Sequence, residues 1–268
     1  MFSYGWSGSS SPHLDTPTLH RCGAMVVGCY GGATKAGATK NEDGALLACA
    51  PDGSWELAMV LDGHHSVQST DLVLATLRSE LGTVERLLAQ PCHVAISDLQ
   101  RHLLGVLGSD TFHAQCRTVR GETACLIVAR KEQFLWWLCI GDCLVYVFHP
   151  ELAALGQYAL NQRSFYEWIG QANTFALPVP CFASGVRELR QGRNVILLAT
   201  DGLLEFGTRP FEDPKALAAM FSAGAGPSTI ERAARAGLER VQMEQGRDSA
   251  TIIAWEVNNP HLATQPSG

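Results

Sequence analysis

Three acidic residues of this chain each adjoin a long apolar run. Asp62 and Asp201 directly follow such runs and are followed by glycine, whereas Asp248 shortly precedes one. The runs predict buried strands, so each carboxylate is expected at a strand tip, held by a rigid element and facing the rim. Because a buried charge without a partner is costly, several such carboxylates indicate convergence on a cation.

The expected cation is a hard divalent metal. Mg²⁺ and Mn²⁺ prefer carboxylate, carbonyl and water oxygens. Asp62 suits a position between two ions, and Gly63 has no side chain to keep its carbonyl from a metal. His64 follows at once, where a general acid would stand. The acidic candidates as a group are Glu42, Asp43, Asp62, Asp142, Asp201, Glu205 and Asp248.

Strands and pairs of helices must position these residues. Apolar spacing predicts strands over 24–27, 45–50, 55–61, 123–130, 134–140, 144–148, 194–200 and 250–257, and helices over 66–89, 94–107, 214–221 and 228–243. The turn at 51–54 predicts a hairpin, and residues 149–190 show no clear period, with only a short helix expected near 165–169. Hairpins and paired helices together indicate one α+β domain with mainly antiparallel sheets.

Composition excludes several classes of function. The net charge of −6 and the absence of a Lys/Arg-rich run argue against nucleic acid or an anionic membrane as a partner. The sequence contains no apolar run of about 18 residues, the length that would predict a membrane span. The nine cysteines are odd in number and lack Cys-x-x-Cys spacing, which favours free thiols and a cytoplasmic protein over disulfides or zinc.

Six short segments, in order, carry a more specific resemblance. They are residues 40–43, 61–64, 121–124, 140–142, 200–205 and 247–251, which read KNED, LDGH, GETA, IGD, TDGLLE and RDSAT. Together they resemble the metal-dependent type 2C serine/threonine protein phosphatases, as a divergent bacterial-type member. The resemblance implies a four-layer αββα sandwich, in which two antiparallel sheets are flanked by helix pairs. The Ser, Gly and Pro content predicts a loosely ordered lead-in over 1–22, and the polar end of the sequence predicts a tail over 259–268. The phosphatase-like domain implied by the resemblance then covers 23–258.

The resemblance also implies roles for single residues. Asp62 would bridge two Mn²⁺ or Mg²⁺ ions, and the Gly63 carbonyl would bind the first of them. Asp201 and Asp248 would hold the second ion, while Glu42 and Asp43 would orient metal-bound waters. Asp142 and Glu205 match the position of a third, weaker ion, although a Gly-Asp pair such as Gly141-Asp142 also forms ordinary hairpin turns.

The implied reaction is hydrolysis of phosphoserine or phosphothreonine in a protein substrate. A metal-bridging hydroxide would attack phosphorus in line while His64 protonates the leaving alkoxide. His64 could instead be a structural imidazole bonded to a backbone carbonyl. The oligomeric state is not indicated by the sequence.

The chain departs from the family pattern at three positions. Ala38 stands where many members carry a phosphate-gripping arginine, His65 replaces a glycine, and Ser249 replaces an asparagine. Lys35 and Lys40 are the nearest cations to position 38 and are the phosphate-binding candidates, with plain surface lysines as the alternative. The missing arginine and the short, aromatic-rich stretch between Asp142 and Asp201 leave open a non-catalytic phosphatase-like module that binds a signalling partner. A third, weaker alternative is a phosphatase for a small phosphorylated metabolite.

Overall fold

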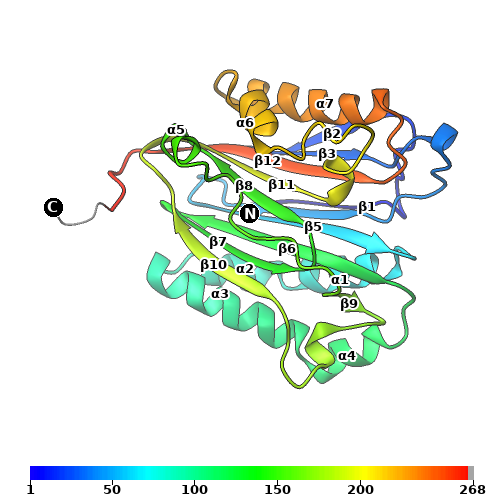
Figure 1. Ribbon diagram of the computed structural model, residues 1–268. Helices are drawn as coiled ribbons and strands as arrows, with labels where there is room; N and C mark the ends of the chain where they lie inside the picture. The colour runs from blue at the N-terminus through cyan, green and yellow to red at the C-terminus, as the bar shows by residue number, and fades with distance from the viewer. Residues whose placement is uncertain (265–268) are drawn as a thin grey trace.

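Two antiparallel sheets face each other between two layers of helices (Figure 1). The structure is a computed structural model that describes residues 1–264. The first sheet has the order β1-β4-β5-β6-β7-β10, with β9 paired to β6, and the second has the order β2-β3-β12-β11-β8. The first sheet comprises β1 (Phe2–Ser7), β4 (Gly44–Cys49), β5 (Trp55–His64), β6 (Glu122–Lys131), β7 (Phe134–Ile140), β9 (Ile169–Gly170) and β10 (Ala183–Glu188). The second comprises β2 (Thr18–Cys22), β3 (Met25–Tyr30), β8 (Leu144–Phe148), β11 (Gly192–Ala199) and β12 (Ala250–Asn259). The predicted αββα sandwich is confirmed.

Helices cover the outer face of each sheet (Figure 1). The first sheet is covered by α1 (Gln68–Ser79), α2 (Leu81–Leu88), α3 (Cys92–Leu107) and α4 (Asp110–Cys116), and the second by α6 (Pro214–Ser222) and α7 (Pro227–Met243). The short α5 (Pro150–Ala154) follows β8, and the 3-10 turns are η1 (Thr34–Ala36), η2 (Thr174–Ala176) and η3 (Asp201–Leu203). The helix expected over 66–89 is divided at Glu80 into α1 and α2.

The segment between β8 and β10 is irregular, and the helix expected near 165–169 is absent. Tyr166 has a φ of 71°, in the left-handed region that a right-handed helix does not use, and Ile169 already belongs to β9. The apolar residues over 165–169 therefore do not form a helix. The segment instead lies across one end of the first sheet, where β9 pairs with the start of β6.

Alternation along the strands divides the core into three apolar layers. On β12, Ile253 and Trp255 pack between the two sheets, whereas Ile252 and Ala254 pack under α6 and α7. A third cluster, which contains Trp136, fills the space between the first sheet and its helices. Both sheets are therefore buried on both faces, and their strand ends are held in fixed positions at the rims.

The N-terminal segment is part of both sheets. The prediction that residues 1–22 are a loosely ordered lead-in is wrong, because β1 pairs with β4 and β2 pairs with β3. Trp6 is buried between the sheets, which explains how a segment rich in Ser, Gly and Pro is ordered. At the other end β12 extends to Asn259, one residue into the tail predicted over 259–268, of which residues 265–268 lie outside the described part.

Two further sequence features have structural counterparts. None of the helices within residues 1–264 combines the length and apolar character that crossing a membrane requires. All nine cysteines are unpaired thiols, and eight of them are buried.

Candidate metal centre

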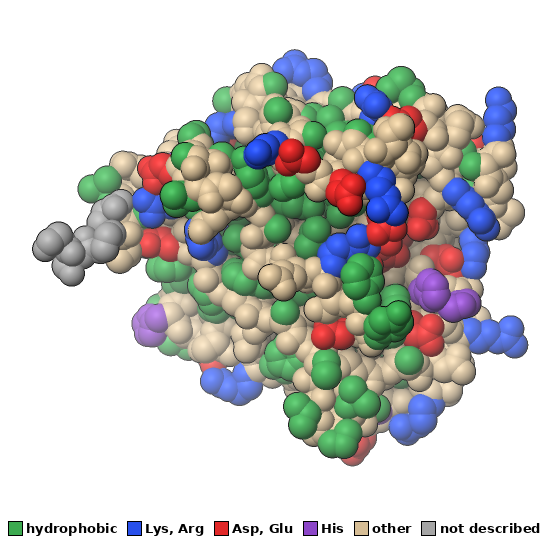
Figure 2. Space-filling view, viewed as in Figure 1, with side chains coloured by type: hydrophobic (Ala, Val, Ile, Leu, Met, Phe, Trp, Pro, Cys, Tyr) green, Lys and Arg blue, Asp and Glu red, His purple; other side chains and the backbone are tan. Residues whose placement is uncertain are grey.

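The acidic candidates emerge at one end of the sandwich because the strands that carry them are antiparallel neighbours. Asp43 precedes β4 and Asp62 lies near the end of β5, its antiparallel neighbour. In the second sheet Asp201 follows β11 and Asp248 precedes β12, again an antiparallel pair. Asp142 lies in the turn between β7 and β8, at the same end. Figure 2 shows acidic side chains gathered in a hollow at this end, with Lys, Arg and His side chains around its rim.

The carboxylates are close enough to perturb one another. The backbone N–H of Asp201 donates to Oδ2 of Asp62 at 3.5 Å. Desolvation and the charges of Asp201, Asp43 and Asp248 raise the pKa of Asp62 well above its usual range. Desolvation together with Asp248 and Asp142 raises the pKa of Asp201 to about 6. The rim therefore concentrates negative charge, which a divalent cation would neutralise.

Asp43 is the most deeply buried of the group, with 1% of its surface exposed. Its Oδ2 accepts hydrogen bonds from Oγ1 of Thr200 at 3.1 Å and from Oγ1 of Thr251 at 2.7 Å. Its Oδ1 is buried without a hydrogen-bond donor within the described part of the chain, and desolvation raises the pKa of the carboxyl well above its usual range. An unpartnered carboxylate oxygen is costly unless a cation meets it. The donor set therefore fits a hard divalent cation.

Two glycines allow the close packing that assembles the centre. A side chain on Gly63 would overlap with the Glu42 carbonyl oxygen, and one on Gly202 would overlap with the Ser249 carbonyl oxygen. Packing therefore requires a glycine at position 63. The contact at Gly202 holds η3 against the start of β12, which brings Asp201 close to Asp248.

The two candidate lysines differ in their surroundings. Lys40 forms an ion pair with Glu42 at 2.8 Å and donates to the backbone carbonyl of His65 at 2.9 Å. Lys35 lies in the exposed η1, where it is a minor contributor to the lowered pKa of Asp15, after hydrogen bonds from Thr34. The structure brings Lys40 to the acidic cluster and leaves Lys35 beside Asp15.

A cavity of about 670 Å³ opens beside the acidic cluster. Residues 37–40, 205–207 and 244–249 contribute to its lining, so Lys40, Ala38 and Arg247 face the same space. Arg247 lies close to the loop that carries Ala38: a side-chain carbon on Gly37 would stand 3.9 Å from its Nε. Arg247 was not a candidate in the sequence, where only its place directly before Asp248 could have indicated it.

His64 lies exposed at the end of β5, at the edge of the cluster. Its ring stacks on Trp168 with 5.5 Å between centroids and meets the His65 ring edge-on at 3.9 Å. Desolvation raises the pKa of Asp248, and the neighbouring His64 acts weakly in the opposite direction, which places the imidazole near that carboxylate. The stacking on Trp168 limits the positions that the imidazole can adopt.

His65 takes a conformation that favours glycine, with a φ of 70°. Within residues 1–264, potential ligand atoms of His64, His65 and Glu122 form one group that lies within 4.8 Å of each other. Both histidines are exposed. The Nδ1 of His65 lies 3.8 Å from a Glu122 oxygen.

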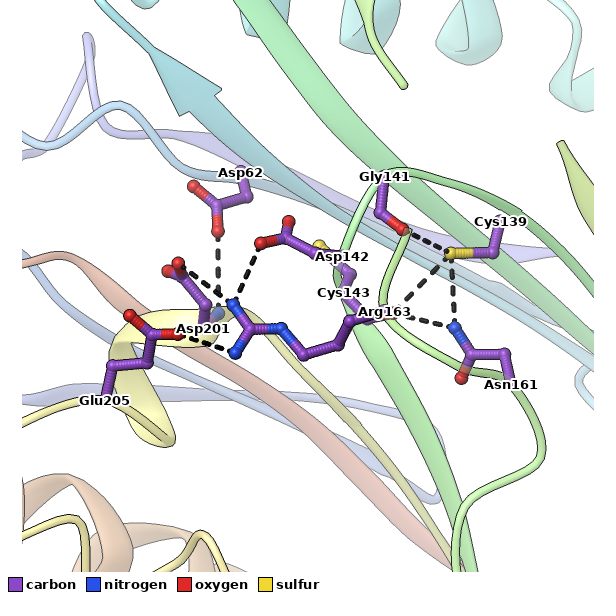
Figure 3. A network of polar contacts seen from close by, with 9 residues as sticks. All are labelled: Asp62, Cys139, Gly141, Asp142, Cys143, Asn161, Arg163, Asp201 and Glu205. Atoms are coloured by element: carbon purple, nitrogen blue, oxygen red, sulfur yellow. Dashed lines mark hydrogen bonds and ion pairs between the residues drawn. The ribbon is translucent and has the colours of Figure 1, made fainter. Parts of the chain in front are cut away.

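One residue that contacts several of the acids was not predicted. The guanidinium of Arg163 contacts Asp142 at 2.9 Å, Asp201 at 3.5 Å and Glu205 at 2.6 Å (Figure 3). Arg163 comes from the irregular segment after β8, where no periodic pattern exists to mark it. Asp142 and Glu205, which the resemblance assigned to a third ion, therefore face a cation of the chain itself.

Comparisons with known proteins agree on the fold. No family model and no curated protein sequence matches the chain. A variant of a bacterial serine phosphatase superposes with a TM-score of 0.62 at 16% identity, over 82% of this chain and 93% of its own. The chain has the fold of the bacterial type 2C phosphatases. PppA of Pseudomonas aeruginosa, a key regulatory component of T6SS, gives a TM-score of 0.59 at 15% identity, covering 96% and 99% of the two chains. The catalytic domain of the serine/threonine phosphatase PstP, in complex with two manganese ions, gives 0.57 at 15% identity, with the same coverage.

Gly202→Ala should weaken Mn²⁺ binding, because the added methyl group would push η3 away from Ser249 and separate Asp201 from Asp248. We expect Mn²⁺ affinity measured by calorimetry to fall about tenfold and the protein to lose about 1–3 kcal/mol of stability. The control is Gly82→Ala in α2, where nothing lies within 4 Å of the added carbon. Equal Mn²⁺ affinity in both variants would contradict the role given to this contact.

Proposed function

We propose that this protein is a divergent type 2C phosphatase that hydrolyses phosphoserine or phosphothreonine in proteins with Mn²⁺ or Mg²⁺. One observation carries the proposal: within this fold, aspartates from separate strand ends converge at one rim, and the buried Oδ1 of Asp43 has no donor in the described chain. The mutual repulsion of these carboxylates is costly unless a bound cation offsets it, which favours a metal-dependent hydrolase over one without a metal.

The proposed metal site is built from both sheets. Asp62 and the Gly63 carbonyl come from β5 of the first sheet, and Asp201 and Asp248 come from the adjoining ends of β11 and β12 in the second. Asp43 and Glu42 stand between them, before β4, and are proposed to bind waters of the ions. Two bound divalent ions would supply a nucleophilic hydroxide from water at neutral pH.

His64 is proposed to protonate the leaving serine or threonine oxygen. It is exposed to substrate, lies near Asp248, and is held by stacking on Trp168. An alkoxide is a poor leaving group, so a proton donor at this position would lower the barrier substantially.

Arg247 and Lys40 are the proposed phosphate-binding cations. Both face the cavity beside the acidic cluster, and Arg247 stands across from Ala38. An arginine can bind two phosphate oxygens at once, whereas Lys40 acts as a point charge and already pairs with Glu42. Arg247 would thus bind the phosphate group, which the methyl side chain of Ala38 cannot do.

A polypeptide substrate fits the surface around the site better than a small metabolite. Apolar side chains of the irregular segment are exposed near Arg163, including Phe165 at 60% and Tyr166 at 91% exposure. An exposed apolar group beside a charged site favours a protein partner. The same surface, together with Ala38, favours the second candidate function, a phosphatase-like module that binds a signalling protein without turnover.

Asp62→Asn should abolish hydrolysis, because a neutral amide cannot bridge two cations as a carboxylate does. We expect turnover of phosphopeptides and of an aryl phosphate to fall at least about 100-fold, and the wild-type protein to lose activity in chelator. Asp98→Asn on the exposed face of α3 is the control. Full wild-type activity in metal-free buffer would exclude the proposal, and Mn²⁺ binding without any turnover would select the binding module.

His64→Ala should impair substrates according to their leaving group. We expect about a 100-fold loss on a phosphoserine peptide and less than about a tenfold loss on p-nitrophenyl phosphate, whose leaving group needs little protonation. The exposed His93→Ala serves as the control. Equal losses on both substrates would show that His64 is not the proton donor.

Arg247→Ala should weaken substrate binding. We expect the KM for a phosphopeptide to rise about tenfold. Arg247→Lys should recover part of the loss, because lysine keeps the positive charge but cannot donate two parallel hydrogen bonds to phosphate. Arg117→Ala, an exposed arginine at the end of α4, controls for general loss of positive charge. An unchanged KM in Arg247→Ala would assign phosphate binding to other groups.

A further inference from the structure

We propose that Arg163 is a built-in cation that occupies the acidic site formed by Asp142, Asp201 and Glu205, and that it thereby limits the protein to two divalent ions. The inference rests on the two-ion site of the proposed function. It concerns a residue that the resemblance does not include, and it gives the irregular segment after β8 a role at the centre.

The guanidinium of Arg163 contacts several carboxylates at once. Its two Nη groups reach carboxylates from three places: the β7–β8 turn, the start of η3 and the position shortly after η3 (Figure 3). Nη1 is 2.6 Å from Oε1 of Glu205, and Nη2 is 2.9 Å from Oδ2 of Asp142 and 3.5 Å from Oδ2 of Asp201. The guanidinium thus lies where these carboxylate oxygens point together.

This charge is permanent. A guanidinium stays protonated at any pH at which the protein folds. A divalent ion can bind Asp142 and Glu205 only by displacing Arg163 and leaving a guanidinium with 21% side-chain exposure without its partners.

Residues on both sides of Arg163 hold it in this position, Asn161 through its side-chain amide. Before it, Asn161 donates to the Cys143 carbonyl at 2.8 Å and accepts from the Val145 N–H at 2.9 Å. After it, the N–H of Ser164 donates to the Gly141 carbonyl at 3.1 Å, and the Phe165 ring lies 4.9 Å from the guanidinium carbon. The arginine is therefore pre-organised at the acids, and an ion competing with it must also disturb this loop.

The charges divide the rim into two parts. No ion pair joins Asp43, Asp62 or Asp248 to a lysine or arginine within residues 1–264, whereas Arg163 contacts Asp142, Glu205 and, at the longer distance of 3.5 Å, Asp201. Asp201 therefore adjoins both parts, through its contacts with Asp62 and Arg163. At the first part, divalent ions can reach Asp62 and Asp248 without displacing a side chain. The second already holds its cation.

Replacing Arg163 by an uncharged side chain should create an additional metal site. We expect wild-type protein to bind two Mn²⁺ ions in calorimetry and equilibrium dialysis, and Arg163→Met to bind three. Mn²⁺ should also raise the Tm of Arg163→Met more than that of wild type, because the variant lacks its internal counter-charge. Arg187→Met, whose guanidinium contacts Gln157 at 2.8 Å away from the acids, should behave as wild type.

A double variant identifies the ligands of the extra ion. Arg163→Met/Asp142→Asn should return to two ions, since the amide no longer supplies the charge. If Arg163→Met is unfolded without metal, recovery of its circular dichroism by Mn²⁺ is the expected result, and failure to recover would overturn the inference. Two ions in both wild type and Arg163→Met would overturn it and leave the proposed function intact. No Mn²⁺ binding by wild type would overturn the proposed function and the count of two ions, whereas one ion bound only by Arg163→Met would still show that Arg163 occupies the acidic site.

Discussion

Repulsion between carboxylates held at fixed strand ends is the constraint on which this end of the molecule depends. Desolvation raises the pKa of Asp43, Asp62 and Asp201, and the charges of neighbouring aspartates raise the pKa of each one further. Apolar layers bury both faces of both sheets, so the strands cannot spread to separate these charges. The repulsion must therefore be offset locally, by donors such as Thr251 or by cations.

The chain offsets this charge with its own cations at some of the acids only. Arg163 contacts Asp142, Asp201 and Glu205, and Lys40 pairs with Glu42. Asp43 and Asp62, the inner acids, instead accept hydrogen bonds from hydroxyl and backbone donors. Such donors stabilise a carboxylate but do not cancel its charge. The inner acids are thus where an external divalent ion gains the most.

Sequence periodicity located the parts of the fold that are buried on both faces. The apolar run of β11 and the Asp201-Gly202 pair after it marked both a strand and its end, which is why the acids could be found. The N-terminal strands were missed because they form sheet edges, where β1 has a single large buried side chain, Trp6. Arg163 was missed for another reason: its partners lie 21 and 42 residues away, and only tertiary contacts connect an irregular segment to them.

The departures from the family pattern are not spread evenly over the site. Position 38 holds an alanine, yet Arg247 faces the same cavity from the neighbouring loop. Arg163 contacts Asp142 and Glu205, which the resemblance assigned to a third ion. The aspartates at the ends of β5 and β11 and before β12 keep the family's order and lie together. A cationic side chain that only binds phosphate or balances charge can come from a different loop, because the place of its charge matters more than the segment that carries it. The ligands of two neighbouring ions must instead be held at fixed positions relative to one another. The rigid strand ends of two packed sheets can hold them there.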